Sequence, residues 1–304
     1  MDQIQAMRTF TRVVEAGSFT KAAESLDLPK GTVTKQIQAL ETRLRVLLLN
    51  RTTRRVTVTP DGAAYYERTL RLLSDLDDIE ASMSNAQARP RGRLRVDIGA
   101  SVARLLVIPA LQDFFTRYPD IQLDLGVSDR PVDLIADNVD CVIRGGELTE
   151  QSLVARRIGN IDFVSVAAPA YLARHGTPAH PTELEQQHTM VSFFSSRTGR
   201  QYDHYFECNG EVHEIAGRYQ LAVNESNALS EAALAGLGIA ALTRFDVKPH
   251  LESGALVQVL PDWKRRTLPF YVVYPPNRHL SAKVRAFVDW AAELFGKNPY
   301  MQVR

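Results

Sequence analysis

The chain has 304 residues, which is more than one ordinary core holds, so we expect two or three folded units. Hydrophobic residues make up 45% and charged residues 23%, with a formal net charge of +1, which is the balance of a globular protein and excludes a disordered bulk. No apolar run reaches the ~18 to 20 residues that a membrane-spanning helix needs, and the N-terminus has no signal-like pattern, so we expect a cytoplasmic protein without a membrane partner.

Positive charge is concentrated near the N-terminus. Between Leu28 and Pro60 there are seven basic residues and one acidic residue, Glu41. From Gly92 onward, 22 basic residues face 24 acidic ones. The positive potential that attracts phosphate is therefore confined to one end of the chain.

The two cysteines, Cys141 and Cys208, are too few for a disulfide framework and lack a metal-binding Cys-x-x-Cys spacing. We interpret them as two buried thiols. A redox-switching pair is the alternative.

Three short amphipathic helices are predicted within the first 45 residues. Gly17 ends the first, and Ser18 is a suitable N-cap for the second. Residues 28–31 break the second helix before the third begins. The apolar stripes are Ile4, Met7, Phe10, Val13 and Val14, then Phe19, Ala22, Ala23 and Leu26, then Val33, Ile37, Leu40 and Leu44.

The third helix exposes short polar donors near its N-terminus, where an ordinary surface helix would more often mix glutamates and lysines. After it, residues 51–59 end in alternating β-branched and polar residues, which predicts a small hairpin. Together these elements predict a winged helix-turn-helix domain over residues 1–60.

A long helix is predicted next, because Pro60 suits a first helical turn and an apolar stripe follows. The stripe comprises Leu70, Leu73, Leu76, Ile79 and Met83. We interpret residues 61–89 as a linker helix that joins two copies of the chain; packing within one chain is the alternative. Residues 89–92 end the helix and mark a domain boundary.

Beyond Gly92 the pattern changes to strands that alternate with helices, which predicts parallel α/β sheets. Strands are expected at 94–98, 121–127, 141–143, 163–167, 190–193 and 238–242, and helices at 104–118, 131–137, 226–235 and 281–295.

An ordered set of motifs closely resembles the LysR-type transcriptional regulators. In the N-terminal part they are FTRVVEAGSFTKAA at 10–23, TVTKQIQALE at 32–41, NRTTRR at 50–55 and TPDG at 59–62. In the C-terminal part they are FFTRYP at 114–119, RGG at 144–146, YL at 171–172 and AGLGIA at 235–240. The resemblance covers the whole chain and is closest to the subgroup of proteobacterial regulators of adhesion and small-molecule catabolism.

Two residues depart from the family pattern. Arg45 stands where the family usually has Gly after the third helix, and Leu49 stands where Phe is common. A non-Gly residue in a left-handed turn costs ~1 kcal/mol, so we expect that cost at Arg45 if the turn has a positive φ.

The resemblance implies double-stranded DNA as a partner, and a helix of this diameter fits the major groove. We expect base-edge contacts from Lys30, Thr34 and Lys35. Thr32, Gln36 and Ser18 are expected to contact phosphates. The wing residues Arg51, Arg54 and Arg55 are expected at the minor groove or backbone, although each residue taken singly could be a solvated polar group.

The resemblance also implies that residues 92–304 form a two-lobed domain like a type 2 periplasmic binding protein, with a small-molecule effector between the lobes. Lobe I would comprise 92–162 and 270–304, lobe II 163–269, with crossings near 161–163 and 269–270. The family pattern places the following residues around the cleft: Ser101, Val102, Ser128, Arg144, Phe193, Asn224 or Ser226, and Thr243.

Structural roles compete with several of these assignments. Ser101 would cap a helix and donate to a carboxylate, but a plain N-cap is an alternative. Arg144 could pair with Asp129 or Asp140 instead. Val102 and Phe193 are as suited to the core as to a pocket.

The sequence therefore predicts a DNA-binding transcription regulator controlled by a small molecule, for which a carboxylate is one candidate, with no cofactor or metal. We expect a homodimer or homotetramer on a pseudo-palindromic operator, with RNA polymerase as a partner if it activates. The alternatives are an effector-independent architectural DNA-binding protein and an enzyme. Against an enzyme, the sequence has no His-Glu-x-x-His and no Gly-x-Ser-x-Gly motif.

Overall fold

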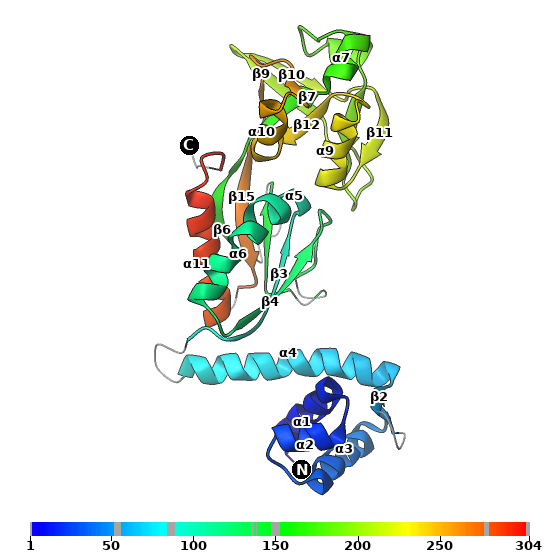
Figure 1. The fold of residues 1–304 in the computed structure, drawn as a ribbon, viewed down its shortest axis with the longest axis vertical. Coiled ribbons are helices and arrows are strands. Elements are labelled where there is room, and N and C mark those ends of the chain that lie inside the picture. Colours follow the sequence, from blue (N-terminus) through cyan, green and yellow to red (C-terminus); the bar gives the residue numbers. More distant parts are fainter. Residues whose placement is uncertain are drawn as a thin grey trace. The chain divides into compact units, whose positions relative to one another are not determined.

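The computed structural model describes residues 2–51, 56–83, 89–134, 137, 139–146, 153–276 and 280–301. The chain divides into two compact units, Met1–Ala88 and Arg89–Arg304 (Figure 1). Within the described ranges, no helix combines the length and the apolar character that crossing a membrane would require.

Unit one is a helical domain with a two-stranded hairpin. Its N-terminal helix is capped by Asp2, which accepts from the amides of Ile4 and Gln5, and ends at Gly17 with φ 60°. The buried side chains pack around Phe10, whose ring meets the edge of Tyr65 at 5.5 Å between centroids. The elements are α1 (Gln3–Ala16), α2 (Phe19–Ser25), α3 (Lys30–Leu44), β1 (Leu49–Arg51), β2 (Val56–Val58) and α4 (Pro60–Met83).

The start of α4 is fixed to the turn before β1. Thr59 donates its amide to the carbonyl of Leu48 (3.0 Å) and its hydroxyl to that of Leu47 (2.7 Å), and its hydroxyl accepts from the amide of Gly62 (2.9 Å). A Cβ at Gly62 would lie 2.0 Å from the Leu48 oxygen. Only glycine therefore permits this close approach.

The apolar stripe of α4 divides between the domain core and the solvent. Leu73 is 7% exposed and Leu70 and Leu76 are half-buried, whereas Ile79 is 58% exposed. The side chain of Met83 lies outside the described residues. Intramolecular packing therefore covers part of the stripe and leaves Ile79 open.

Lobe I of unit two is a five-stranded sheet with the order β4-β3-β5-β15-β6. Strands β3, β4 and β5 are parallel, as predicted, but β15 is antiparallel to both of its neighbours, so the sheet is mixed. The cause is that β15 re-enters the sheet from the other lobe. The elements of lobe I are β3 (Gly92–Ile98), α5 (Ala100–Val102), a π-helical turn (Ala103–Val107), α6 (Ile108–Arg117), β4 (Ile121–Val127), β5 (Cys141–Gly145), β6 (Val154–Ile161), β15 (Leu268–Tyr274) and α11 (Ala282–Gly296).

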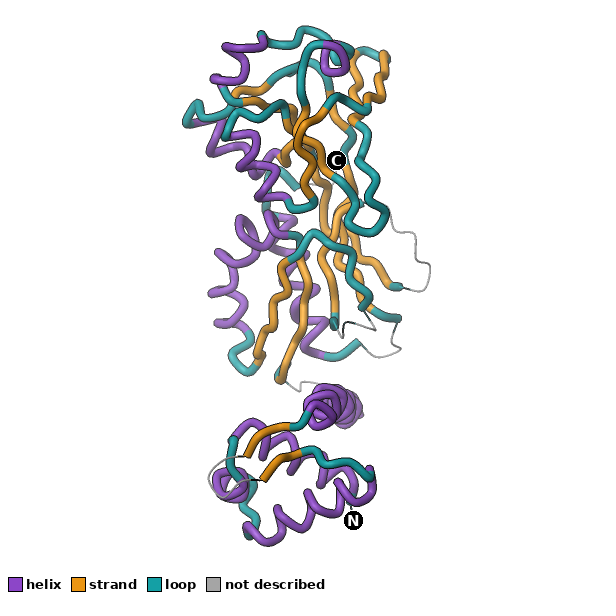
Figure 2. The backbone as a smooth tube through the Cα atoms, turned by 90° about the vertical axis from the view of Figure 1, so that its right-hand side faces the viewer, coloured by secondary structure: helices purple, strands orange, loops and turns teal. Residues whose placement is uncertain are grey.

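The helices of lobe I cover one face of this sheet (Figure 2). The core there joins strand residues such as Ile98 and Val272 to Phe114 of α6 and Phe287 of α11. On the opposite face, a smaller cluster includes Leu134.

The prediction of a helix at 131–137 is wrong over the described residues, where the chain forms a hydrogen-bonded turn. The amide of Asp137 donates to the carbonyl of Asp133, and the carboxylate of Asp137 accepts from the amide of Asp133 (3.0 Å). This local side-chain bond competes with helix formation.

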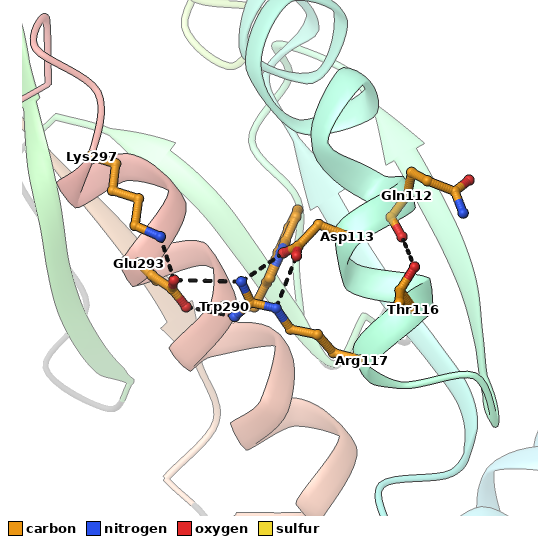
Figure 3. A network of polar contacts seen from close by, with 7 residues as sticks. All are labelled: Gln112, Asp113, Thr116, Arg117, Trp290, Glu293 and Lys297. Carbon is orange, nitrogen blue, oxygen red and sulfur yellow. Dashed lines mark hydrogen bonds and ion pairs between the residues drawn. The ribbon is translucent and has the colours of Figure 1, made fainter.

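Helices α6 and α11 are joined by a network of charges (Figure 3). The guanidinium of Arg117 bridges Glu293 (2.6 Å) and Asp113 (3.0 Å). Asp113 also accepts from the indole nitrogen of Trp290 (2.9 Å), and Glu293 accepts from Lys297 (2.5 Å).

Lobe II is built from short strands in three small sheets, with the orders β12-β7-β13, β10-β9-β14 and β11-β8. The chain enters it between Ile161 and Phe163 and returns between Arg265 and Leu268. Its elements are β7 (Phe163–Ala167), α7 (Pro169–His175), α8 (Glu183–Gln186), β8 (Met190–Phe193), β9 (His204–Cys208), β10 (Glu211–Ile215), β11 (Tyr219–Val223), α9 (Ser226–Leu234), β12 (Ala240–Thr243), α10 (Arg244–Glu252), β13 (Val257–Gln258) and β14 (Lys264–Arg265).

The two cysteines lie on strands of different lobes and are both free. Cys141 is fully buried on β5, and burial raises the pKa of its thiol, which disfavours the reactive thiolate. Cys208 on β9 is only partly buried, so the expectation of two buried thiols is correct for Cys141 alone.

Candidate functional site

The N-terminus of α3 presents exposed lysines and two amides without a hydrogen-bond acceptor among the described residues. Lys30 and Lys35 are exposed. No side chain caps the helix, because the N-cap residue is Pro29. The amide of Thr32 donates to the carbonyl of Pro29 (2.8 Å), so the amides of Lys30 and Gly31 are left for water or for a phosphate.

The other predicted contact residues of the helical region are partly occupied by bonds within the domain. Thr34 donates its hydroxyl to the carbonyl of Lys30 (3.0 Å), and the amide oxygen of Gln36 accepts from Thr9 (2.6 Å), which leaves the NH2 group of Gln36 to donate outward. Ser18 caps α2, and Thr32 is half-buried.

Glu41, which the sequence singled out only as an acid among bases, is a buried anchor. One of its carboxylate oxygens accepts from the backbone amides of Leu48 (3.0 Å) and Leu49 (3.1 Å). These bonds tie the end of α3 to the start of the wing.

The turn between α3 and the wing has the left-handed conformation at Arg45, with φ 57° and ψ 31°. The expected strain is therefore present at this position. Leu49 is 2% exposed and fills the core in place of a larger side chain. Arg54, Arg55 and the side chain of Arg51 lie outside the described residues.

A cavity of about 640 Å³ lies between the two lobes of unit two. Its lobe I wall contains the residues that follow β3, β4 and β5, which is where ligands of open α/β sheets bind. Of the residues predicted from the sequence, Ser101, Val102, Arg144, Phe193, Ser226 and Thr243 line it, whereas Ser128 and Asn224 are not among the lining residues. The Ser128 hydroxyl accepts from the amide of Arg130, and Asn224 donates to Ser196.

The helix N-termini at this cavity are already occupied by Asp129. Its carboxylate accepts from the amides of Ala100 (2.9 Å) and of Ser226 (2.6 Å), which belong to different lobes. The amide of Ser101 donates to the Ser226 hydroxyl (3.0 Å). An internal carboxylate therefore takes the place that sequence reasoning gave to an effector.

Arg144 is paired with Asp97 and not with either of the acids considered from the sequence. Burial raises the pKa of Asp97, and the charge of Arg144 opposes that rise. This pair neutralises Arg144 internally.

Arg265, which the sequence did not identify, lines the cavity, and its guanidinium lies over the ring of Phe206, 4.6 Å from the ring centroid. Its guanidinium donates to Ser165 (3.1 Å) and to Nδ1 of His204 (2.8 Å), and no carboxylate of the described residues lies within ion-pair distance of it. Burial lowers its pKa to about 10. Nothing near Arg265 in the sequence marks it, because its environment depends on β9 and β7.

His204 also lines the cavity and is held neutral. Burial, followed by the charge of Arg265, lowers the pKa of His204 to about 3. Because Nδ1 accepts from Arg265, the proton is on Nε2, and this buried atom has no hydrogen-bond partner among the described residues. The hydroxyl of Thr243 is unpartnered in the same way.

Each of the two units matches a known protein family. Residues 4–63 match the bacterial regulatory helix-turn-helix protein of the lysR family, and residues 87–296 match the LysR substrate binding domain.

Individual relatives are similar in sequence to this chain over nearly its full length. The chain is 42% identical to an HTH-type transcriptional repressor of Pseudomonas aeruginosa over 303 residues, which is 100% of this chain and 95% of the relative. It is 34% identical to the regulator CrgA of Neisseria meningitidis, covering 97% of both chains.

Solved structures show the same similarity. The full-length virulence activator AphB of Vibrio cholerae has a TM-score of 0.59 at 31% identity, covering 95% of this chain and 98% of that chain. CrgA of Neisseria meningitidis has a TM-score of 0.59 at 32% identity, covering 95% and 97%. The chain is therefore a member of the LysR family, a DNA-binding transcriptional regulator with an effector-binding domain.

Proposed function

We propose that this regulator responds to a small anionic metabolite of the carboxylate class, bound by Arg265 in the cavity between the lobes. The observation that carries the proposal is a half-buried guanidinium that lines the cavity without a carboxylate partner in the described part of the chain. A buried charge is costly unless it is paired, and an anionic ligand supplies the missing partner.

The surroundings of Arg265 favour the same ligand class. The imidazole of His204 carries an unpartnered N–H, and Thr243 carries an unpartnered hydroxyl; both residues line the cavity. Buried polar atoms of this kind usually have a partner, and a ligand oxygen would provide one once side-chain movements open these atoms, which are closed to solvent here, to the cavity. A volume of about 640 Å³ suits a small metabolite.

A thermal-shift screen of mono- and dicarboxylates against the full chain tests the proposal. A ligand at about a hundred times its dissociation constant adds roughly 2.7 kcal/mol to the free energy of unfolding. Arg265→Gln should abolish the shift, and Arg244→Gln, which removes an exposed charge outside the cavity lining, should preserve it. A shift that survives in Arg265→Gln would refute the assignment.

For the DNA we propose the contacts expected from the sequence. Exposure of Lys30 and Lys35 and the uncapped start of α3 support base-edge contacts from Lys30, Thr34 and Lys35. Ser18, Thr32, Gln36 and the wing arginines Arg51, Arg54 and Arg55 complete the proposed interface through phosphates or the minor groove.

We also propose the domain division 1–60, 61–89 and 92–304, a cytoplasmic location, and a homo-oligomer on a pseudo-palindromic operator. Contact with RNA polymerase is part of the proposal only for an activator. The family and its relatives are regulators, which supports a function without catalysis.

A further inference from the structure

Two histidines and a glutamate converge in lobe II, and none of the three is among the residues that line the cavity. Glu211 and His213 are two positions apart on β10, so their side chains lie on the same face of the strand. His180 reaches them from the segment before α8. Their ligand atoms all lie within 4.8 Å of one another.

The carboxylate of Glu211 is at the centre of this group. One of its oxygens lies 2.7 Å from Nε2 of His213 and 3.5 Å from Nε2 of His180. A single carboxylate oxygen is therefore within reach of both imidazole nitrogens.

Packing fixes the orientation of both imidazoles. His180 and His213 each meet the indole of Trp263 at a steep angle, with ring centroids 4.9 and 5.4 Å away, and the two imidazole centroids are 4.8 Å apart. Nδ1 of His180 lies 2.8 Å from the hydroxyl of Thr182. Nδ1 also accepts from the backbone amide of Thr182 (3.3 Å), so the ring proton is on Nε2, which faces Glu211, and a metal ion bound at Nε2 would displace that proton.

We propose that His180, Glu211 and His213 bind a first-row transition-metal ion of the zinc type. Two imidazole nitrogens and one carboxylate oxygen form a ligand set typical of Zn²⁺, with the fourth position left to solvent. Metal–ligand distances of about 2.0 to 2.1 Å in a tetrahedron separate the ligand atoms by about 3.3 Å. The present spacings bracket that value, so small side-chain movements complete the site.

A bound metal would connect the β9–β10 hairpin to the chain before α8. The same hairpin contributes His204, Tyr205 and Glu214 to the cavity wall, and β14, which carries Arg265, pairs with β9. The metal would therefore stiffen one wall of the cavity. The proposal itself rests on other residues than the proposed effector site, so either can fail without the other.

Zinc binding is tested with the tag-free full chain in a Cys208→Ser background, because Cys208 faces Glu211 across the hairpin and thiolates bind zinc. Competition with a chromophoric zinc chelator should give one ion per chain. His213→Ala and Glu211→Gln should each lower the affinity by more than about tenfold, the smaller end of what loss of even a supporting partner costs.

His250→Ala, a histidine on α10 outside the cluster, is the matched control and should bind zinc like the parent. Thermal unfolding gives a second readout: zinc should raise the midpoint of the parent and of His250→Ala but not that of Glu211→Gln, which preserves the size of the side chain. Absence of a bound ion, or equal affinity in all variants, would overturn the proposal.

Discussion

A single buried carboxylate connects the two halves of the DNA-binding domain. Glu41 is 7% exposed, and its oxygen receives the amides of Leu48 and Leu49, so the end of the recognition helix and the beginning of the wing depend on one side chain. Removing a buried charged acceptor leaves its donors desolvated and unpaired.

Glu41→Ala should therefore destabilise unit one by about 3 kcal/mol and weaken binding to every DNA sequence. The effect is measured by urea unfolding of the full chain, monitored through a probe attached to unit one. Glu15→Ala is the control, since Glu15 is exposed and its ion pair with Arg12 is worth less than about 1 kcal/mol. Equal losses in the two variants would contradict the anchoring role.

The roles of such residues cannot be predicted from the sequence, because they depend on contacts between different segments of the chain. Spacing predicts that Val33 and Ile37 are buried, because one helix determines their common face. It does not predict the neutral imidazole of His204 or the lack of a carboxylate partner for Arg265 in the described residues. Both depend on a contact between two residues that are 61 positions apart in the chain. Asp129 was considered only as a partner for Arg144, yet it occupies two helix N-termini.

At the scale of elements, α3 and the wing are expected to contribute differently to DNA binding. Lys35→Ala should relax sequence preference, because we propose that the N-terminus of α3 contacts base edges. Arg54→Ala should weaken all sequences alike and reduce the slope of log affinity against log salt by roughly one. Binding titrations at several salt concentrations, on operator and random DNA, distinguish the two; unchanged slopes in both variants would reject the assignment.

The α6–α11 network should make unit two sensitive to acid. Hydrogen bonds from Arg117 and then Lys297 lower the pKa of Glu293 from 4.5 to about 2. The unfolded chain thus binds a proton at Glu293 at a higher pH than the folded chain does. The network stabilises the fold above pH 4.5, and this contribution is lost as the pH falls through about 2.

Glu293→Gln should accordingly lower the thermal midpoint of unit two near neutral pH and flatten its dependence on pH in the acid range. Scans from pH 7 down to the acid limit of solubility provide the measurement. Glu231→Gln, at an exposed position on α9, should follow the parent. If the thermal midpoint fell equally with pH in Glu293→Gln and in the parent, the network would not contribute to the pH dependence of folding.

Elements were predictable where apolar residues alternate along a strand, as in β4, or form a short, largely buried run, as in β7 and β8. The strands at 121–127, 163–167 and 190–193 have the predicted bounds. The β9–β10 hairpin was missed although Asn209-Gly210 stands at its turn with φ 49° and 86°, a strong two-residue hairpin signal. The two-residue strands β13 and β14 have no pattern of their own and exist only through pairing.

At the scale of the whole molecule, the exposed part of the α4 stripe is expected to hold two chains together. Ile79→Glu should shift the oligomer toward monomers in sedimentation velocity and lower operator affinity, because burying a charge in an apolar interface is unfavourable. Gel-shift stoichiometry on a pseudo-palindromic operator should be two chains per pair of half-sites. A site saturated by one monomer would refute this arrangement.

The close approach at Gly62 has a mechanical consequence. Thr59 bonds the first turn of α4 to Leu47 and Leu48, and Gly62 lets the carbonyl of Leu48 come close, so α4 and the turn before β1 should rotate as one rigid piece. A helix of 24 residues is about 36 Å long. A tilt of about 5° at one end therefore displaces the other by about 3.1 Å, close to the ~3.4 Å rise of one base pair, so very small angular changes are enough to shift α3 by one base pair along the DNA.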